Sequence, residues 1–224
     1  MRLTAHKGSD SLHQTLASSQ RKELQFDELQ QAFIDVAAAF GGAIAARDAY
    51  TAGHQNNVAR IAVAIGAQLG ISEFDLMGLR LGALLHDIGK IGVPLEYLTK
   101  TDRLTDPEMS IVKLHPEIGY RILKDVQMPW PVKEIIHQHH ERLDGSGYPR
   151  GLAGDDIVPE AQIVAVADCV DAILNPRPYR GRLELADVTG VLLQERGRHL
   201  DVEAVEACLS IIGDGKQWIR NVGV

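Results

Sequence analysis

The sequence predicts an all-α fold. Along most of its 224 residues, apolar side chains recur at steps of three and four, the spacing that one face of an α-helix presents. The strict alternation of apolar and polar residues that marks a half-buried β-strand does not appear. A chain of this length can bury one sizeable hydrophobic core. We therefore expect a helical bundle formed by residues 23–224, preceded at residues 1–22 by a polar linker or a frayed helix start.

The first expected helix begins near Leu24 and ends where Gly41 and Gly42 loosen the turn. Its apolar residues share one face, which we expect to lead into the core. These residues are Phe26, Leu29, Phe33, Val36, Ala37 and Phe40.

Further helices with the same period follow. Thr105 and Glu108 have the spacing of a capping box, which predicts a helix start. Pro116 and Pro131 suit the first turns of two more helices. The inward residues expected in the two helices before Thr105 are Val58, Ile61, Ile65 and Leu69, and then Leu76, Leu79 and Ala83.

The C-terminal part combines a loop, a buried segment and two amphipathic segments. The Gly-rich stretch at residues 144–156 is the one long loop, and such loops often carry function. Residues 161–174, AQIVAVADCVDAIL, are apolar nearly all round, which is typical of a central buried helix, although a buried strand would look similar. Residues 188–196 and 201–212 predict the last helices.

Composition and charge exclude several classes of protein. The chain has 23 Lys and Arg residues against 30 Asp and Glu residues, a net charge of −7, so it does not coat nucleic acid by bulk electrostatics. Two distant cysteines, Cys169 and Cys208, suit neither a disulfide framework nor a thiolate metal site. The sequence has no signal-peptide core and no apolar run of the ~20 residues that a membrane span needs. We therefore expect a cytoplasmic location.

Two of the nine histidines continue the inward face of a predicted helix. His54 keeps the register of Val58, and His86 keeps that of Ala83. A single inward histidine is more often a core residue than a metal ligand. Several together favour a metal site.

Three further histidines lie close together at residues 137–140. A step of about 100° per residue along a helix places His139 and His140 on its apolar face and points His137 away from that face. We therefore expect His139 and His140, but not His137, to contribute to a site.

Two aspartates accompany these histidines. Asp87 follows His86 at the end of an apolar helix, and Asp168 interrupts an apolar run, where an unpaired buried carboxylate would be costly. Imidazole and carboxylate ligands without thiolate suit iron, manganese, zinc or nickel better than magnesium. The set is large enough for two divalent ions.

Two motifs resemble the signatures of the HD-GYP phosphodiesterases. They are HDIGK at residues 86–90 and HHERLDGSGYP at residues 139–149. ARDAYTAGH at residues 46–54 and VADCVDAILNPRPYR at residues 166–180 fall in the same order, so the resemblance covers residues 40–185 approximately. It implies an HD-domain helical bundle with a long GYP loop over a binuclear metal site.

The resemblance also implies a ligand set. Asp87 would bridge the two ions. Some family members hold a third ion with a Glu at the position where this chain has Tyr50, so we expect two ions, iron or manganese first, with zinc or nickel as alternatives. The implied ligands are His54, His86, Asp87 and Asp168 for the first ion and His115, His139 and His140 for the second.

The same resemblance assigns the substrate contacts. Lys90, one helical turn beyond His86, would act beside Asp87 in catalysis by binding a phosphate and offsetting its charge. Arg177 and Arg180 would bind phosphate oxygens, and Tyr148 would stack on the substrate or donate a hydrogen bond to it. From its position one turn after Asp168, Asp171 could order a ligand histidine or pair with Arg180. Glu141, Arg142 and Asp144 are expected to form a structural salt-bridge network.

The implied reaction is hydrolysis of cyclic di-GMP to linear pGpG, and a second cut to GMP is left open. One alternative keeps the chemistry but takes another cyclic dinucleotide, such as cyclic GMP-AMP. A second alternative is a weakly active signalling module that binds the nucleotide. We expect neither DNA or RNA nor a membrane as a partner, whereas protein signalling partners at the GYP loop and a homodimer are both left open.

Overall fold

The computed structural model describes residues 28–47, 53–174 and 185–213. Within these ranges the regular structure is helical, and the β-type pairing is limited to an isolated bridge between Arg196 and Leu200. None of the helices in this part of the chain is long and apolar enough to cross a membrane. The chain divides into two compact units, residues 1–36 and residues 37–224, and every site residue discussed below belongs to the second unit. The all-α prediction is therefore confirmed.

Residues 28–45 form the first helix, but most of the face that was predicted to point inward is exposed. Ala37 and Ile44 are buried, whereas Phe40 is 57% exposed. A Cβ added at Gly41 would lie 2.8 Å from the carbonyl oxygen of Leu84, so the buried stripe uses small residues where backbones approach closely. The helical repeat of apolar residues in the sequence could not by itself distinguish this buried stripe from the exposed stripe of larger apolar side chains. The residues expected inward but found exposed are Leu29, Phe33, Val36 and Phe40.

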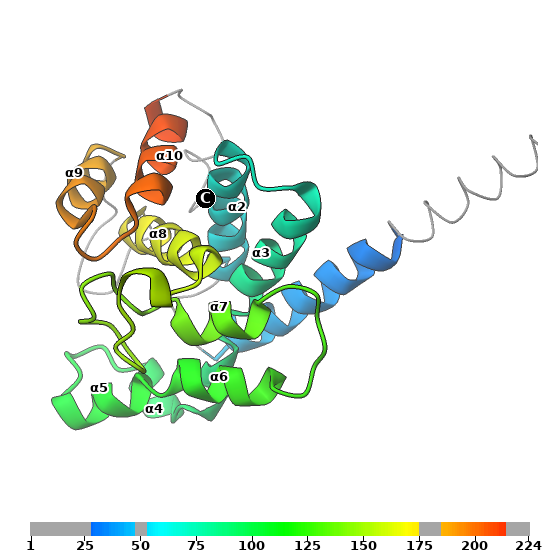
Figure 1. Ribbon diagram of the computed structural model, residues 1–224. Coiled ribbons are helices and arrows are strands. Elements are labelled where there is room, and N and C mark those ends of the chain that lie inside the picture. The colour runs from blue at the N-terminus through cyan, green and yellow to red at the C-terminus, as the bar shows by residue number, and fades with distance from the viewer. Residues whose placement is uncertain (1–27, 48–52, 175–184, 214–224) are drawn as a thin grey trace, which may run out of the picture. The chain divides into compact units, whose positions relative to one another are not determined.

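Three helices form the centre of the second unit. Helix α2 (His54–Gln68) packs against α3 (Glu73–Leu85) on one side and against α8 (Pro159–Leu174) on the other. Helix α10 (Val202–Gly213) covers α2 and α8, and α9 (Leu185–Glu195) lies beside α8 and α10, as Figure 1 shows. The predicted inward residues of α2 and α3 are buried except Leu69, which follows the last turn of α2 and is 38% exposed.

A second group of shorter elements completes the unit. It comprises η1 (Ile88–Gly92), α4 (Leu95–Leu98), α5 (Asp106–Val112), α6 (His115–Leu123), α7 (Val132–Gln138) and η2 (Gly154–Asp156). The capping box of Thr105 and Glu108 begins α5, Pro116 lies in the first turn of α6, and Pro131 caps α7, so all three predicted starts are confirmed. Helix α7 packs against both α6 and α8, between which it lies in Figure 1.

Gly89 explains how η1 and α6 come together. A Cβ added there would lie 1.8 Å from the carbonyl oxygen of His115 and 2.5 Å from the amide nitrogen of Gly119. Only a residue without a side chain allows this approach. The glycine of the HDIGK motif therefore brings the start of α6, and with it His115, up to Asp87.

Candidate metal centre

Histidine and aspartate side chains gather where several helices of the second unit begin or end. His54 begins α2, His86 follows the last residue of α3, His115 begins α6, and His139 follows the last residue of α7. All four are buried. Helix ends supply these positions because the chain turns there, which allows side chains from different elements to converge.

Three of the histidines are oriented in the same way. Nδ1 of His86 lies 2.7 Å from the carbonyl oxygen of Ala83, Nδ1 of His115 lies 2.9 Å from that of Val112, and Nδ1 of His139 lies 2.8 Å from that of Ile136. Each carbonyl lies three residues earlier, in the last turn of a helix, where carbonyls lack intrahelical partners. Because a carbonyl only accepts, each Nδ1 carries a hydrogen, which leaves Nε2 as the atom through which each ring can bind a metal when the ring is neutral.

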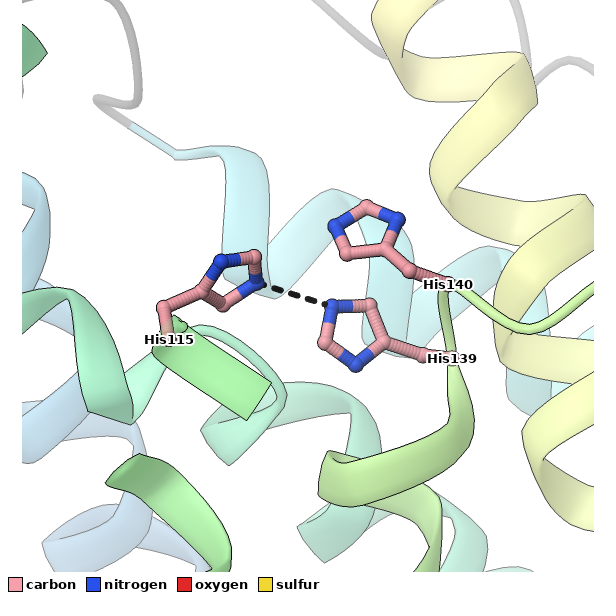
Figure 2. Close-up of side chains that lie close together, drawn as sticks. All are labelled: His115, His139 and His140. Atoms are coloured by element: carbon pink, nitrogen blue, oxygen red, sulfur yellow. Dashed lines mark hydrogen bonds between the residues drawn. The ribbon is translucent and has the colours of Figure 1, made fainter. Parts of the chain in front are cut away.

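The lone pairs of His115 and His139 face each other. Their Nε2 atoms lie 3.3 Å apart, and Figure 2 shows both rings, with His140 beside them, pointing into a common space. Two neutral imidazoles oriented through Nδ1 have no hydrogen to place between these atoms. A cation would satisfy both of them.

Burial keeps these imidazoles neutral. It lowers the pKa of His115 to about 4, an effect that the Asp87 carboxylate opposes only in part. Burial and neighbouring histidines hold the pKa values of His139 and His140 well below the usual range. Neutral imidazole is the form that binds metal, so the three rings match what a transition-metal ion requires.

Asp87 lies between this group and a second one. Its Oδ1 is 3.4 Å from Nε2 of His115, and its Oδ2 is 3.4 Å from Nε2 of His86 and 3.8 Å from Nε2 of His54. Burial opposes ionisation, but the pKa of Asp87 is held well below its usual range, chiefly by the Lys90 ammonium. An ionised carboxylate with one oxygen toward each group suits a bridging ligand.

The ring of His54 is held by carboxylates rather than by a carbonyl. Its Nδ1 lies 2.5 Å from Oδ2 of Asp171, and its Nε2 lies 3.3 Å from Oδ1 of Asp168. Burial lowers the pKa of His54, but the hydrogen bonds to Asp168 and Asp171 outweigh it and raise the pKa to about 10. Of the two roles considered for Asp171, ordering a ligand histidine is the one supported here.

The described residues form two groups, each of which could hold a metal ion. Two groups of ligand atoms each lie within 4.8 Å of one another, and they are His54, His86 and Asp87, and His115, His139 and His140. Asp168, whose side chain is 19% exposed, adjoins the first group through His54. The structure therefore brings together all seven residues predicted as ligands, in the predicted division.

Lys90 and Tyr148 lie next to the two groups. Nζ of Lys90 is 2.7 Å from Oδ2 of Asp87, beside the histidines without being one of the grouped ligands. The ring of Tyr148 stacks on His140, with centroids 4.7 Å apart and planes at 28°. Two of the four residues predicted to contact substrate are thus adjacent to the centre, and the other two, Arg177 and Arg180, lie outside the described residues.

A sequence model of the HD domain family matches residues 15–204, most of the chain. The chain belongs to the HD domain family. This agrees with the resemblance of its HDIGK and GYP motifs to HD-GYP proteins.

Relatives support the same family, and a solved structure shows the same fold. The cyclic di-GMP phosphodiesterase response regulator RpfG of Xanthomonas campestris is 38% identical over 210 residues, which cover 92% of this chain and 56% of RpfG. The 3'3'-cGAMP-specific phosphodiesterase 3 of Vibrio cholerae is 35% identical, over 83% of this chain and 41% of its own length. Among solved structures, Bd1817, an HDG"Y"P protein from Bdellovibrio bacteriovorus, matches with a TM-score of 0.63 at 24% identity. The match covers 83% of this chain and 64% of Bd1817, and it shows that the two share a fold. The chain thus spans about half the length of these two relatives.

His137 lies apart from the HD-domain histidine groups, as predicted, but it is not solvent-facing. It is buried, its Nε2 lies 2.9 Å from Oε2 of Glu117, and its ring stacks on Tyr120. Helix α7 ends at Gln138, so His139 and His140 reach the centre from beyond the helix and not from its apolar face. The structure thus places His139 and His140 in one histidine group and His137 outside it, but the helical phase does not explain the positions of His139 and His140.

Glu141 was expected to form salt bridges, and this is wrong. Its two carboxylate oxygens accept hydrogen bonds from the backbone amides of Arg150 at 2.8 Å and Leu152 at 3.0 Å. Arg142 donates to the carbonyl oxygens of His139 and Glu141. These two residues hold the backbone of the GYP loop, which is the segment between α7 and η2. Contacts of a side chain with backbone leave no charge pattern in the sequence.

Asp144 does take part in ion pairs, with His199 at 3.1 Å and Arg198 at 3.7 Å. This contact between the loop and the α9–α10 connection was missed from sequence, because His199 lies 55 positions from Asp144 and has no motif around it. Tyr50, Arg177 and Arg180 lie outside the described residues, so their predicted roles are not addressed.

Proposed function

We propose that this HD domain protein is a metal-dependent hydrolase that cuts cyclic di-GMP to linear pGpG. One observation carries the proposal: the buried Asp87 carboxylate lies between two groups of histidines, with the Lys90 ammonium 2.7 Å away. The similarity to RpfG, a cyclic di-GMP phosphodiesterase, supports the choice of substrate.

The proposed ligands divide as the two groups do. His54, His86 and Asp168 would hold one ion, with Asp87 shared. The other ion would be held by His115, His139 and His140. A nitrogen and oxygen donor set without thiolate favours iron or manganese, with zinc or nickel also compatible. When bound, such ions polarise the phosphodiester and lower the pKa of the attacking water.

The chain's own residues would orient and neutralise the substrate. Lys90 would offset the charge that grows on the phosphoryl oxygens as water adds to phosphorus and the bond to the 3′ oxygen breaks. The departing oxygen takes a proton, which leaves a 3′ hydroxyl and a 5′ phosphate in the linear product. Asp171 would hold the His54 ring by binding Nδ1, so that Nε2 stays directed at the centre. No covalent intermediate with the protein is required.

Cyclic GMP-AMP is the alternative substrate, and the similarity to the Vibrio cholerae enzyme specific for it keeps this alternative open. The described residues reveal no contact that distinguishes guanine from adenine. Arg177 and Arg180 remain predicted phosphate ligands. The third candidate function is a nucleotide-binding module with weak activity. The complete set of proposed metal ligands disfavours it.

One experiment separates these functions. Protein purified anaerobically, with its metal content measured, is incubated with cyclic di-GMP, cyclic GMP-AMP and GTP in parallel, and the products are resolved by chromatography. We expect turnover of cyclic di-GMP to pGpG at the highest rate. Preference for cyclic GMP-AMP would support the alternative, and filled sites without turnover would support the binding module.

Other predictions concern the whole protein. A catalytic domain at residues 23–224, a homodimer and signalling partners at the GYP loop all stay predictions. A cytoplasmic location is also still a prediction, and the unpaired state of Cys169 and Cys208 is compatible with it.

A further inference from the structure

An open pocket of about 250 Å³ adjoins the metal centre. The proposed metal ligand His140 forms one wall. The other walls come from the residue after α5, from the GYP loop and from the α9–α10 connection, and they include Lys113, Arg142, Gly147, Tyr148 and His199.

The pocket is basic in a chain whose net charge is −7. Lys113 and Arg142 line it, and within the described part of the chain no carboxylate does. The nearby carboxylate of Asp144 is engaged by His199 and by Ser146, at 2.5 Å from the hydroxyl. An acidic protein needs a local basic cluster to bind an anion, and this pocket is one.

Arg142 is held so that part of its guanidinium remains available. Nη1 donates to the carbonyl oxygens of Glu141 at 2.7 Å and His139 at 3.3 Å, which fixes the side chain. No hydrogen bond within the described residues engages its Nη2 or Nε. These nitrogens can donate to the oxygens of a phosphate without the cost of ordering the side chain first.

Lys113 approaches the same space from the other side. Its Nζ lies 5.1 Å from the centroid of the Tyr148 ring, which stacks in turn on His140. Gly147 permits this packing, because a Cβ there would lie 2.4 Å from Cα of Glu141 and 2.5 Å from the carbonyl oxygen of His140. The cation is therefore separated from the proposed metal ligand by one aromatic ring.

We propose that this pocket is the subsite for the second phosphodiester of the cyclic dinucleotide, the one that is not being cut, and that Lys113 and Arg142 bind it. The proposal rests on the proposed function. The two phosphodiesters of such a substrate belong to one small ring, so when one lies at the metals the other must lie beside them. The pocket is the basic space that begins at a ligand of the second ion.

Two substrates test the subsite. Cyclic di-GMP carries two phosphodiesters, whereas bis(p-nitrophenyl) phosphate carries one and needs only the metal centre. For Lys113→Met we expect the KM for cyclic di-GMP to rise about 10-fold, the value of one charge-assisted contact, while hydrolysis of bis(p-nitrophenyl) phosphate is unchanged. Arg142→Gln, which keeps a donor for the carbonyl oxygens, should act in the same direction. Lys124→Met removes an exposed lysine outside the pocket and should change neither substrate.

The results separate this proposal from the proposed function. An unchanged KM for cyclic di-GMP in both pocket variants would overturn the subsite, and so would an equal loss on both substrates. If the parental protein does not cut cyclic di-GMP, the proposed function fails, and the subsite is judged by inhibition of bis(p-nitrophenyl) phosphate hydrolysis by pGpG. Inhibition about 10-fold weaker in Lys113→Met supports the subsite, whereas equal or absent inhibition overturns it.

Discussion

The Nδ1 atoms of His86, His115 and His139 are each oriented by a carbonyl three residues earlier. The backbone thus fixes the tautomer of three proposed ligands without using any further side chain. His54 is the exception, because its Nδ1 is oriented by the Asp171 carboxylate instead of a backbone carbonyl. At the scale of single residues, the centre depends on where helices end as much as on which residues are present.

Lys90 is predicted to act on the transition state. Lys90→Met keeps the aliphatic length and removes the ammonium 2.7 Å from Asp87. We expect both ions to be retained and kcat on cyclic di-GMP to fall by about 10²–10³, the usual cost of losing one such preorganised group. Steady-state kinetics with metal content measured on the same sample checks this. A parental rate with both sites filled would show that Lys90 has no such role.

His137 is predicted to matter for stability and not for metal. His137→Ala removes a buried hydrogen bond to Glu117 and the stacking on Tyr120. We expect the free energy of unfolding to fall by about 1–3 kcal/mol, with metal content unchanged. Urea unfolding and metal analysis test this, with His137→Gln as a control that keeps one donor. Loss of metal from a folded His137→Ala protein would contradict the assignment.

The positions of some of these residues could be predicted from the sequence, and those of others could not. The register of α2 predicted that His54 points inward, because that helix is regular from its first residue. His139 and His140 lie beyond the end of α7, so a helical phase could not place them, and the motif did. The carboxylate of Glu141 binds backbone amides of a loop, and such contacts leave no periodic or charge signal in a sequence.

Between elements, close backbone approach at Gly89 is the decisive contact. In Gly89→Ala the new Cβ would lie 1.8 Å from the carbonyl oxygen of His115, so η1 and α6 would have to separate. We expect the free energy of unfolding to fall by about 3 kcal/mol, and metal affinity to weaken as His115 moves from Asp87. Thermal unfolding and metal analysis measure both effects.

Gly190 supplies a matched control with the opposite sign. It lies in α9, and a Cβ added there meets nothing within 4 Å. Gly190→Ala should therefore stabilise the protein by about 0.5–1 kcal/mol through helix propensity alone, without changing metal content. Equal stability of the Gly89→Ala and Gly190→Ala proteins would contradict the role given to Gly89.

Elements with strong local signals were predictable. Capping residues and proline marked the starts of α5, α6 and α7, and periodicity marked α2 and α3. The short elements η1 and α4 have too few residues for a periodic pattern, and they were not predicted. Most of the buried face of the first helix was also missed. Ala37 was predicted correctly, but Gly41 allows close packing without being hydrophobic, so the apolar pattern did not mark it.

For the molecule as a whole, positive side chains are concentrated beside the two histidine groups. The net charge is −7, yet Lys90, Lys113 and Arg142 gather around the two histidine groups. Fixed cations in a partly buried site attract phosphates more effectively than the same charges spread over a surface. The proposed cyclic dinucleotide site therefore combines the two histidine groups with the basic pocket that begins at His140.

The number of metal ions needed for turnover distinguishes a binuclear phosphodiesterase from the other candidate functions. Protein stripped of metal with a chelator is titrated anaerobically with Mn²⁺ or Fe²⁺, and the rate of cyclic di-GMP hydrolysis is measured against the ions added per chain. We expect the rate to rise until two ions are bound per chain and then to level off, and we expect Asp87→Ala to recover no activity because its carboxylate is shared. A plateau at one ion per chain, or activity that persists in the stripped protein, would contradict a binuclear phosphodiesterase.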